Sequence, residues 1–175
     1  FGDLFEKESF DEARRLIDEG GKWFRFLNNG LDTLNPNVVK TAVMDLGFES
    51  AFYGLRARNA AKEKYHCNIP WAILFDPTSA CNLHCIGCWA AEYGHTLNLS
   101  FDVMDKLVTE GKELGCHFYL LTGGEPLMRK WDIIRLCKKH NDCEFHAFTN
   151  GTLIDDDFCK AVTDVGNLSF SISIE

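Results

Sequence analysis

Short apolar runs alternate with helical patterns of hydrophobic residues from residue 69 onward. The apolar runs are the expected strands, at residues 71–75, 116–121, 145–148 and 168–175. The expected helices have apolar residues at intervals of three and four, over residues 100–115, 131–137 and 158–165. Strands that alternate with helices are typical of a parallel sheet covered by helices. The pattern therefore predicts an α/β fold with four βα-type strands, in a barrel or in a doubly wound sheet.

Only helical patterns precede this region, and their ends carry clear signals. The signals are the capping box Ser9-x-x-Glu12, the pair Gly20-Gly21, the pair Asn29-Gly30, the pair Asn35-Pro36 and Gly47. Between Gly21 and Asn29 the segment is helical or looped. Gly47 is expected to stop one helix, and another should run from about Phe48 to Lys64. We predict a helical N-terminal extension over residues 1–67 and an α/β domain over residues 68–175.

The last expected strand alternates strictly between apolar and polar side chains. One side would carry Leu168, Phe170, Ile172 and Ile174, and the other would carry Ser169, Ser171, Ser173 and Glu175. A strand covered by helices on both faces usually reads as a continuous apolar run. Hydroxyl and carboxyl groups are costly to bury without partners. The alternation therefore favours a barrel whose polar lumen is a binding cavity.

Three cysteines lie close together directly after the first expected strand, at Cys81, Cys85 and Cys88. Thiolates at this spacing can surround one soft centre. A structural zinc needs a fourth ligand, for which the candidates are His84, Cys67 and Cys116. A [4Fe–4S] cluster normally takes four cysteines, so a cluster held by three leaves one iron open to another ligand. The triplet favours a reactive cluster over zinc.

Four motifs in βα order resemble those of the radical S-adenosylmethionine (SAM) superfamily. They are the triplet Cys81-x3-Cys85-x2-Cys88, the segment Thr122-Gly123-Gly124-Glu125-Pro126-Leu127, the segment Thr149-Asn150-Gly151-Thr152 and the segment Ser171-Ile172-Ser173-Ile174-Glu175. The resemblance covers roughly residues 70–175 and leans toward the branch with molybdenum-cofactor synthesis enzymes and peptide-modifying enzymes with auxiliary clusters. It implies an incomplete (β/α)6 barrel in which the first four βα units are present.

The resemblance also implies the chemistry. In this family a [4Fe–4S] cluster on three cysteines, here Cys81, Cys85 and Cys88, cleaves SAM reductively to a 5′-deoxyadenosyl radical that abstracts hydrogen from a substrate. The substrate would be a peptide or a small molecule, and a flavodoxin- or ferredoxin-type protein would be the reductant. The implied SAM-binding positions are Gly123, Gly124, Glu125, Pro126, Thr149, Asn150, Ser173 and Glu175. An iron–sulfur electron carrier or sensor without SAM chemistry is the alternative.

Two details of the SAM site follow from the resemblance. The glycines would let backbone groups approach the SAM amino group, while Glu125 would fix the turn or add charge complementarity. The chain departs from the family before its third cysteine, where a usually aromatic residue that helps to hold the adenine is Gly87. Trp89 or the backbone alone could hold the adenine here, and Trp89 could equally be a packing residue.

Composition narrows the class of protein further. With 46% hydrophobic residues the chain can build a core without disulfides, so its eight cysteines fit free thiols and a cluster. A net charge of −8 argues against a nucleic-acid surface. Neither a membrane span nor a signal peptide is visible, so we expect a cytoplasmic protein. The missing initiator methionine, and a strand that ends at Glu175, predict that the chain is part of a longer protein.

Overall fold

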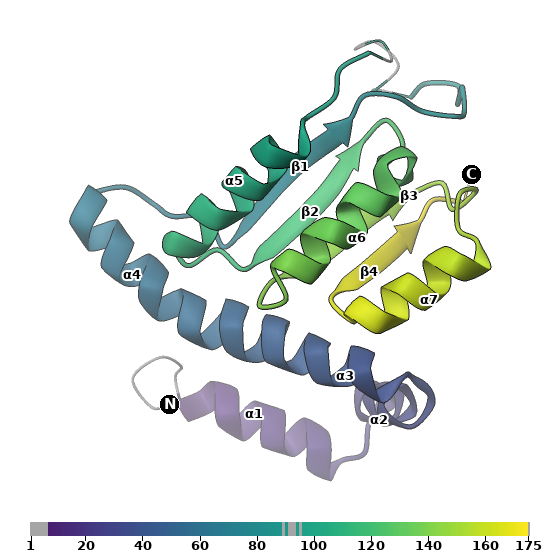
Figure 1. The fold of residues 1–175 in the computed structure, drawn as a ribbon. Coiled ribbons are helices and arrows are strands. Elements are labelled where there is room, and N and C mark those ends of the chain that lie inside the picture. Colours follow the sequence, from purple (N-terminus) through teal and green to yellow (C-terminus); the bar gives the residue numbers. More distant parts are fainter. Residues whose placement is uncertain (1–6, 89, 91–93, 95, 175) are drawn as a thin grey trace.

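The molecule combines one α/β layer structure with a group of N-terminal helices (Figure 1). The structure is a computed structural model that describes residues 7–88, 90, 94 and 96–174. Four parallel strands form one sheet in the order β1-β2-β3-β4. The strands are β1 Ala72–Thr78, β2 Phe118–Gly123, β3 Glu144–Thr149 and β4 Leu168–Ile172. The α/β class and the incomplete barrel predicted from the sequence are confirmed.

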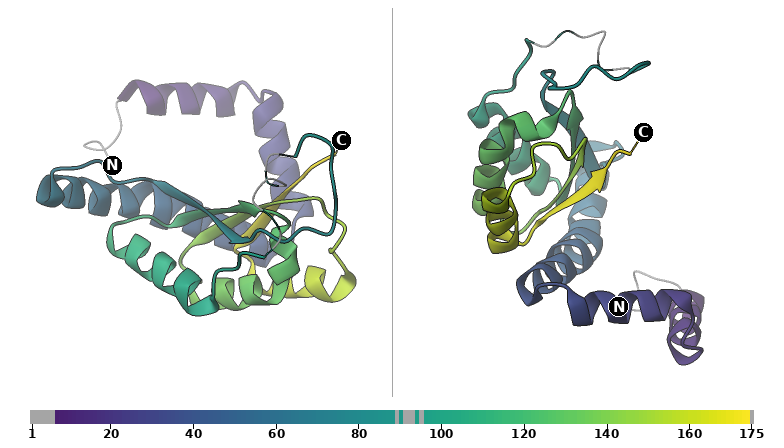
Figure 2. Two further views of the ribbon diagram at one scale, coloured as in Figure 1. Left: turned by 90° about the horizontal axis from the view of Figure 1, so that it is seen from above. Right: turned by 90° about the vertical axis from the view of Figure 1, so that its right-hand side faces the viewer.

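The helices that follow the strands cover one face of the sheet (Figure 2). They are α5 Phe101–Glu113, the 3₁₀ turn η3 Pro126–Arg129, α6 Lys130–Lys139 and α7 Asp156–Val165. The sheet residues beneath them are apolar and fully buried, for example Tyr119, Leu121, Phe145 and Ala147. Because side chains alternate along a strand, the residues between these point to the opposite face. In the part of the chain that the structure describes, no helix packs on that opposite face.

The polar side of the fourth strand lies on this uncovered face, as predicted. Ser169 Oγ donates to Glu144 Oε1 at 3.0 Å, and Ser171 Oγ lies 2.9 Å from Nε2 of His146. On the other side of β4, the Phe170 ring packs against Phe158 of α7, with ring centroids 5.8 Å apart. The strict alternation therefore separates a helix-covered core from a polar sheet face.

The N-terminal helices differ most from expectation. The helices α3 Pro36–Ala42, the π-helical η1 Val43–Tyr53 and α4 Gly54–Tyr65 follow one another without interruption. Together they form one long rod that runs across the amino ends of the strands (Figure 1). The prediction that Gly47 stops a helix is therefore wrong. A glycine inside a helix costs about 1 kcal/mol relative to alanine, and packing of the rod against β2 and β3 offsets this cost.

Close backbone contact fixes this rod against the sheet. A Cβ atom on Gly54 would lie 2.5 Å from the carbonyl oxygen of Gly115, so no larger residue fits there. The Arg58 guanidinium donates to that same oxygen at 2.7 Å and to the carbonyl oxygen of Ser50 at 3.1 Å. Arg58 therefore has a structural role.

Other boundaries shift by a few residues. Ser9 lies inside α1 Lys7–Asp18 rather than at its start, and α2 Lys22–Thr33 continues through Gly30. The strand expected at residues 116–121 begins at Phe118. The amide of Cys116 still donates to the carbonyl oxygen of Gly111 at the end of α5, at 2.9 Å, so it is not part of the sheet. The fourth strand ends at Ile172, not at Glu175, which lies outside the described residues. The boundary between residues 67 and 68 stays a prediction.

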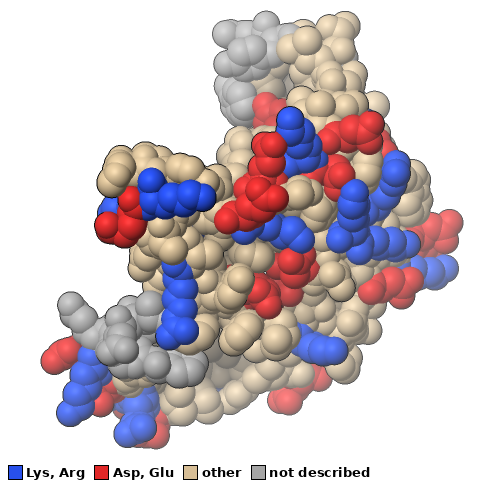
Figure 3. Space-filling model, turned by 60° about the vertical axis from the view of Figure 1, so that its left-hand side comes forward, with Lys and Arg blue, Asp and Glu red and all other residues tan. Residues whose placement is uncertain are grey.

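Acidic and basic side chains are interspersed on the molecular face shown in Figure 3. No large patch of a single sign is visible on that face. Among the described helices, none is both long enough and apolar enough to cross a membrane. The charge distribution on this face offers no basic surface for phosphate binding.

Candidate functional site

The three cysteines of the triplet lie in the loop after β1, at the carboxyl end of the sheet (Figure 1). All three line one small pocket of about 110 Å³, together with Ser79, Leu83, His84, Ala90 and Gly124. Cys85 and Cys88 are exposed and Cys81 is half-buried. The thiols thus face a common space that is open to solvent.

The spacing of these thiols suits a cluster better than a single ion. Ligand atoms of one tetrahedral zinc with Zn–S bonds near 2.3 Å lie only about 3.8 Å apart. Among the described residues, the one group with three metal-ligating atoms within 4.8 Å of one another is at the opposite end of the sheet. Cys67 and Cys116, two candidates for a fourth zinc ligand, also precede the strands rather than follow them. His84, the third candidate, does line the pocket with the three thiols. A cluster is favoured over zinc because no three of these four side chains bring their ligand atoms within 4.8 Å of one another.

Gly123 and Gly124 allow the end of β2 to touch the cysteine loop. A Cβ atom on Gly124 would collide with the carbonyl oxygens of Ser79 and Ala80, and one on Gly123, at φ +109°, would lie 2.6 Å from the carbonyl oxygen of Thr78. The amide of Gly124 donates to Thr78 O at 3.0 Å. These glycines are therefore needed for contact within the protein, in addition to any approach to SAM.

Glu125 links the ends of two strands from a buried position. Its side chain is 1% exposed. One carboxylate oxygen accepts from the Leu127 amide at 2.9 Å and from the Thr149 hydroxyl at 2.7 Å, and the other accepts from the Asn150 amide at 2.8 Å. Of the two roles expected for Glu125, fixing the turn is the one that these bonds supply.

A side-chain network joins the cysteine loop to the loop after β3. Nδ2 of Asn150 donates to Oδ1 of Asn82 at 3.0 Å, and Nδ2 of Asn82 donates to the Thr152 hydroxyl at 2.8 Å. The Thr152 hydroxyl donates in turn to Oδ1 of Asn150 at 2.7 Å. Sequence analysis missed Asn82 because its partners lie about seventy residues away, although its place inside the triplet was a signal.

One cavity of about 370 Å³ brings most of the expected site residues together. It is lined by Cys81, Cys85, Ile86, Gly87, Cys88, Thr122, Gly123, Gly124, Glu125, Phe148, Thr149, Asn150 and Ser173. Two expected residues are not among them. Pro126 is buried at the start of η3, and Glu175 lies outside the described residues, as does Trp89. Gly87, with φ +77°, borders the cavity where the family usually has an aromatic ring.

A second cavity of about 530 Å³ lies beside the first and shares Gly123 and Gly124 with it. Asp76, at the end of β1, lines this cavity, and burial raises the pKa of its carboxyl group. No sequence motif included Asp76, because a polar residue near a strand end is common. Its place next to the glycines makes it a further polar group at the site.

Polar side chains on the uncovered sheet face lead toward this site. When Glu144 is ionised, the single hydroxyl proton of Ser169 is donated to it, and Nδ1 of His146, 3.0 Å away, is then the donor to Ser169 Oγ. Nε2 of His146 then accepts from the Ser171 hydroxyl at 2.9 Å. Burial raises the pKa of Glu144 to about 7 and lowers the pKa of His146. His146 was missed, although its alternation with apolar neighbours in β3 signalled a polar face.

Replacing Gly124 by alanine is expected to destabilise the fold by about 2–3 kcal/mol, because both backbone segments near its Cβ would have to move. Gly47→Ala is the matched control, since open space surrounds its Cβ within a helical segment and alanine is favoured there by up to about 1 kcal/mol. Urea unfolding followed by circular dichroism measures both. A Gly124→Ala protein as stable as the parent would contradict the close contact with the cysteine loop.

Comparison with known families agrees with this site. Residues 75–175, more than half of the chain, match the family model of the Radical SAM superfamily. The chain therefore belongs to the radical SAM superfamily, whose enzymes use a [4Fe–4S] cluster and SAM. The identification made from four motifs is confirmed.

Curated relatives match the chain over its α/β part. An AdoMet-dependent heme synthase from Methanosarcina barkeri is 29% identical over 112 residues, which are 62% of this chain and 32% of the relative. A GTP 3′,8-cyclase from Limosilactobacillus fermentum is 33% identical over 104 residues, which are 56% of this chain and 31% of the relative. The chain spans about a third of the length of these relatives.

Solved structures share the fold. The crystal structure of Streptococcus suis SuiB bound to precursor peptide SuiA has a TM-score of 0.56 at 20% identity, over 70% of this chain and 28% of that one. SuiB bound to S-adenosylmethionine has a TM-score of 0.53 at 19% identity, over the same shares. At this identity the likeness shows the fold alone.

Proposed function

We propose that this chain is the cluster- and SAM-binding part of a radical SAM enzyme. The observation that carries the proposal is the single cavity of about 370 Å³ in which all three thiols meet the glycine pair and the loop after β3. A bound [4Fe–4S] cluster and SAM would supply a carbon radical able to take hydrogen from a substrate. The three thiols fit this cluster because they border one pocket without converging on one ion.

Each site residue receives a role from its contacts. Cys81, Cys85 and Cys88 are the proposed cluster ligands, and the backbone at Gly123 and Gly124 is the proposed surface for the methionine part of SAM. Half-buried Asn150 and exposed Ser173, which line the cavity with Thr149, are proposed SAM or substrate contacts. Glu125, Pro126 and Thr149 are proposed positioning residues, since each is buried and the polar groups of Glu125 and Thr149 bond within the protein.

The substrate is proposed to lie against the uncovered sheet face. Phe148 and Ser173 line the cavity. His146 precedes Phe148 by two residues and Ser171 precedes Ser173 by two, so both lie on the same uncovered face of the sheet. Two residues of a strand span about 7 Å. The polar surface formed by His146 and Ser171 therefore extends from the cavity toward the amino ends of the strands. A peptide or small molecule with polar groups fits such a surface.

Two further expectations remain proposals. All eight cysteines are free thiols, which fits a reducing compartment, and we propose the cytoplasm. A flavodoxin- or ferredoxin-type protein is the proposed electron donor.

Electron paramagnetic resonance of the full-length protein tests the proposal. The protein is reconstituted with iron and sulfide without oxygen, reduced with dithionite and measured with and without SAM. We expect a [4Fe–4S]⁺ signal that changes when SAM is added, because SAM would bind at or beside the open iron. A cluster signal that ignores SAM would instead favour an electron carrier or sensor. Zinc without iron or sulfide would favour a structural zinc module.

A further inference from the structure

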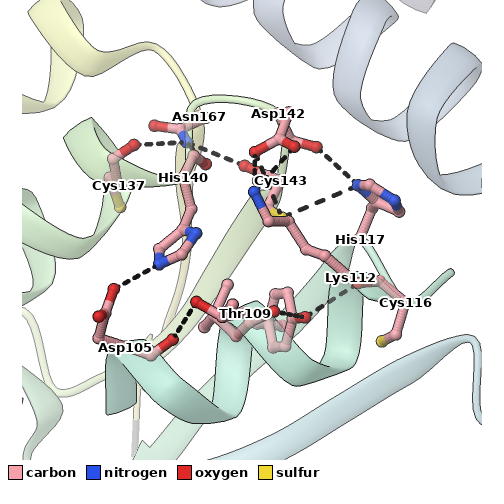
Figure 4. A network of polar contacts seen from close by, with 12 residues as sticks. Asp105, Thr109, Lys112, Cys116, His117, Cys137, His140, Asp142, Cys143 and Asn167 are labelled. Carbon is pink, nitrogen blue, oxygen red and sulfur yellow. Dashed lines mark hydrogen bonds and ion pairs between the residues drawn. The ribbon is translucent and has the colours of Figure 1, made fainter. Parts of the chain in front are cut away.

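A second set of metal-ligating side chains lies at the opposite end of the sheet from the cysteine loop. His117 directly precedes β2, while Asp142 and Cys143 directly precede β3 (Figure 4). Each of these strands has six residues, which span about 20 Å. This set is therefore separate from the site proposed for the cluster and SAM.

The three side chains converge on one small volume. The Sγ atom of Cys143 lies 3.9 Å from Nδ1 of His117 and 3.9 Å from Oδ1 of Asp142, and one ligand atom from each residue lies within 4.8 Å of the others. A tetrahedral zinc with Zn–N near 2.0–2.1 Å and Zn–S near 2.3 Å places its nitrogen and sulfur ligands about 3.6 Å apart. The observed separations match this value after a small adjustment.

The surroundings of this set are buried and short of hydrogen-bond partners. His117 is 4% exposed and Cys143 is fully buried. Nε2 of His117 and Oδ2 of Asp45 are both buried without a partner in the described structure. Asp45, from the rod above, interacts electrostatically with Asp142 and Cys143. Buried polar atoms without partners cost about 1–3 kcal/mol each. The ring nitrogen of His117 that lies toward Cys143 is Nδ1 rather than Nε2, so the convergence of the three ligand atoms is what indicates a cation site.

We propose that His117, Asp142 and Cys143 form a zinc-type cation site at the amino ends of β2 and β3. Mixed nitrogen, oxygen and sulfur ligands suit zinc. The carbonyl oxygen of Asp142, 3.0 Å from Nδ1 of His117, or a water molecule completes four ligands. Binding releases the thiol proton of Cys143 and the Nδ1 proton of His117. The ion joins the segments before two neighbouring strands.

Lys112 is the competing cation at this site. Its Nζ lies 2.8 and 2.9 Å from the two carboxylate oxygens of Asp142. A bound ion needs only one of these oxygens, so Lys112 can keep the other. The Asp142 side chain is 42% exposed, which opens a path for the ion. Without an ion, the same contacts are an ordinary salt bridge and a bond from His117 to a carbonyl group.

Metal titration of the full-length protein separates these two interpretations. The parent protein carries alanine at Cys81, Cys85 and Cys88, so that the cysteine loop binds no metal. Zinc is titrated against a chromophoric chelator, and cobalt is titrated to detect its thiolate absorption band. We expect one zinc equivalent that Cys143→Ala and His117→Gln each remove. Cys116→Ala is the matched control, because it deletes another buried thiol before β2 and leaves the three ligands in place.

Lys112→Met supplies a test that a loss of folding cannot imitate. Removing the competing ammonium is expected to tighten zinc binding about tenfold, which corresponds to about 1.4 kcal/mol. A salt bridge without an ion predicts no such gain. Equal zinc equivalents in the parent, Cys143→Ala and His117→Gln proteins would overturn the proposal, as would unchanged zinc affinity in Lys112→Met. Neither result depends on the proposed radical chemistry, since the cysteine loop of the parent holds no cluster.

Discussion

Replacing Cys85 by alanine is expected to abolish reductive cleavage of SAM by the full-length protein. The Cys85 thiol is exposed and borders the same pocket as Cys81 and Cys88. Since a [4Fe–4S] cluster normally has four thiolate ligands and this loop supplies three, the loss of one more leaves two irons without protein ligands. Iron and sulfide content and the release of 5′-deoxyadenosine under dithionite measure the effect.

Cys159→Ala is the matched control for this substitution. Cys159 is an exposed thiol on α7, away from the cysteine loop. We expect the control to keep its cluster and its SAM cleavage at the level of the parent. A Cys85→Ala protein with a complete, SAM-responsive cluster would show that another side chain is the third ligand.

The parts of the site that depend on short stretches of chain were predictable from the sequence. The cysteine triplet lies within eight residues, and the glycine pair lies within one turn, so their spacing is visible without the fold. The polar side of β4 was predictable for the same reason, because strand alternation has a fixed period of two. Ser169 and Ser171 do lie opposite the helix-covered core.

The roles of single side chains depend on distant partners and were not predictable. Glu125 could have faced SAM or the protein, and its bonds to Thr149 and Asn150 decide between these only in the folded chain. Asn82 binds a loop about seventy residues away. Motifs therefore identified which residues gather at the site, while the fold determined which of them hold the others in place.

The continuous rod across the strand ends shows a second limit of sequence patterns. Glycine is typical of a helix end, yet the chain continues through Gly47 as a π-helical segment. Asp45 and Ser50, on either side of it, are buried. Tertiary packing of the whole segment outweighs a local propensity of about 1 kcal/mol.

Substitutions of Glu125 are expected to separate its structural role from a direct electrostatic role toward SAM. Glu125→Ala removes an acceptor from three donors, on Leu127, Thr149 and Asn150. Bonds to a charged acceptor contribute about 1.5–3 kcal/mol each and are not additive, so we expect a loss of about 4 kcal/mol in the free energy of unfolding. Glu125→Gln keeps one acceptor oxygen and the shape of the side chain, so about half of this loss is expected.

Urea unfolding and the SAM-dependent change in the cluster signal are measured on the same variants. Glu113→Ala, at an exposed position at the end of α5, controls for loss of a carboxylate and should change neither quantity. If Glu125 holds the loop after β3 against the end of β2, the SAM response should fall in step with stability, in the order parent, Glu125→Gln, Glu125→Ala. A Glu125→Gln protein with parental stability and no SAM response would show instead that the charge itself acts on SAM. The three donors that surround the carboxylate favour the first outcome, because they leave the protein dependent on this acceptor before SAM binds.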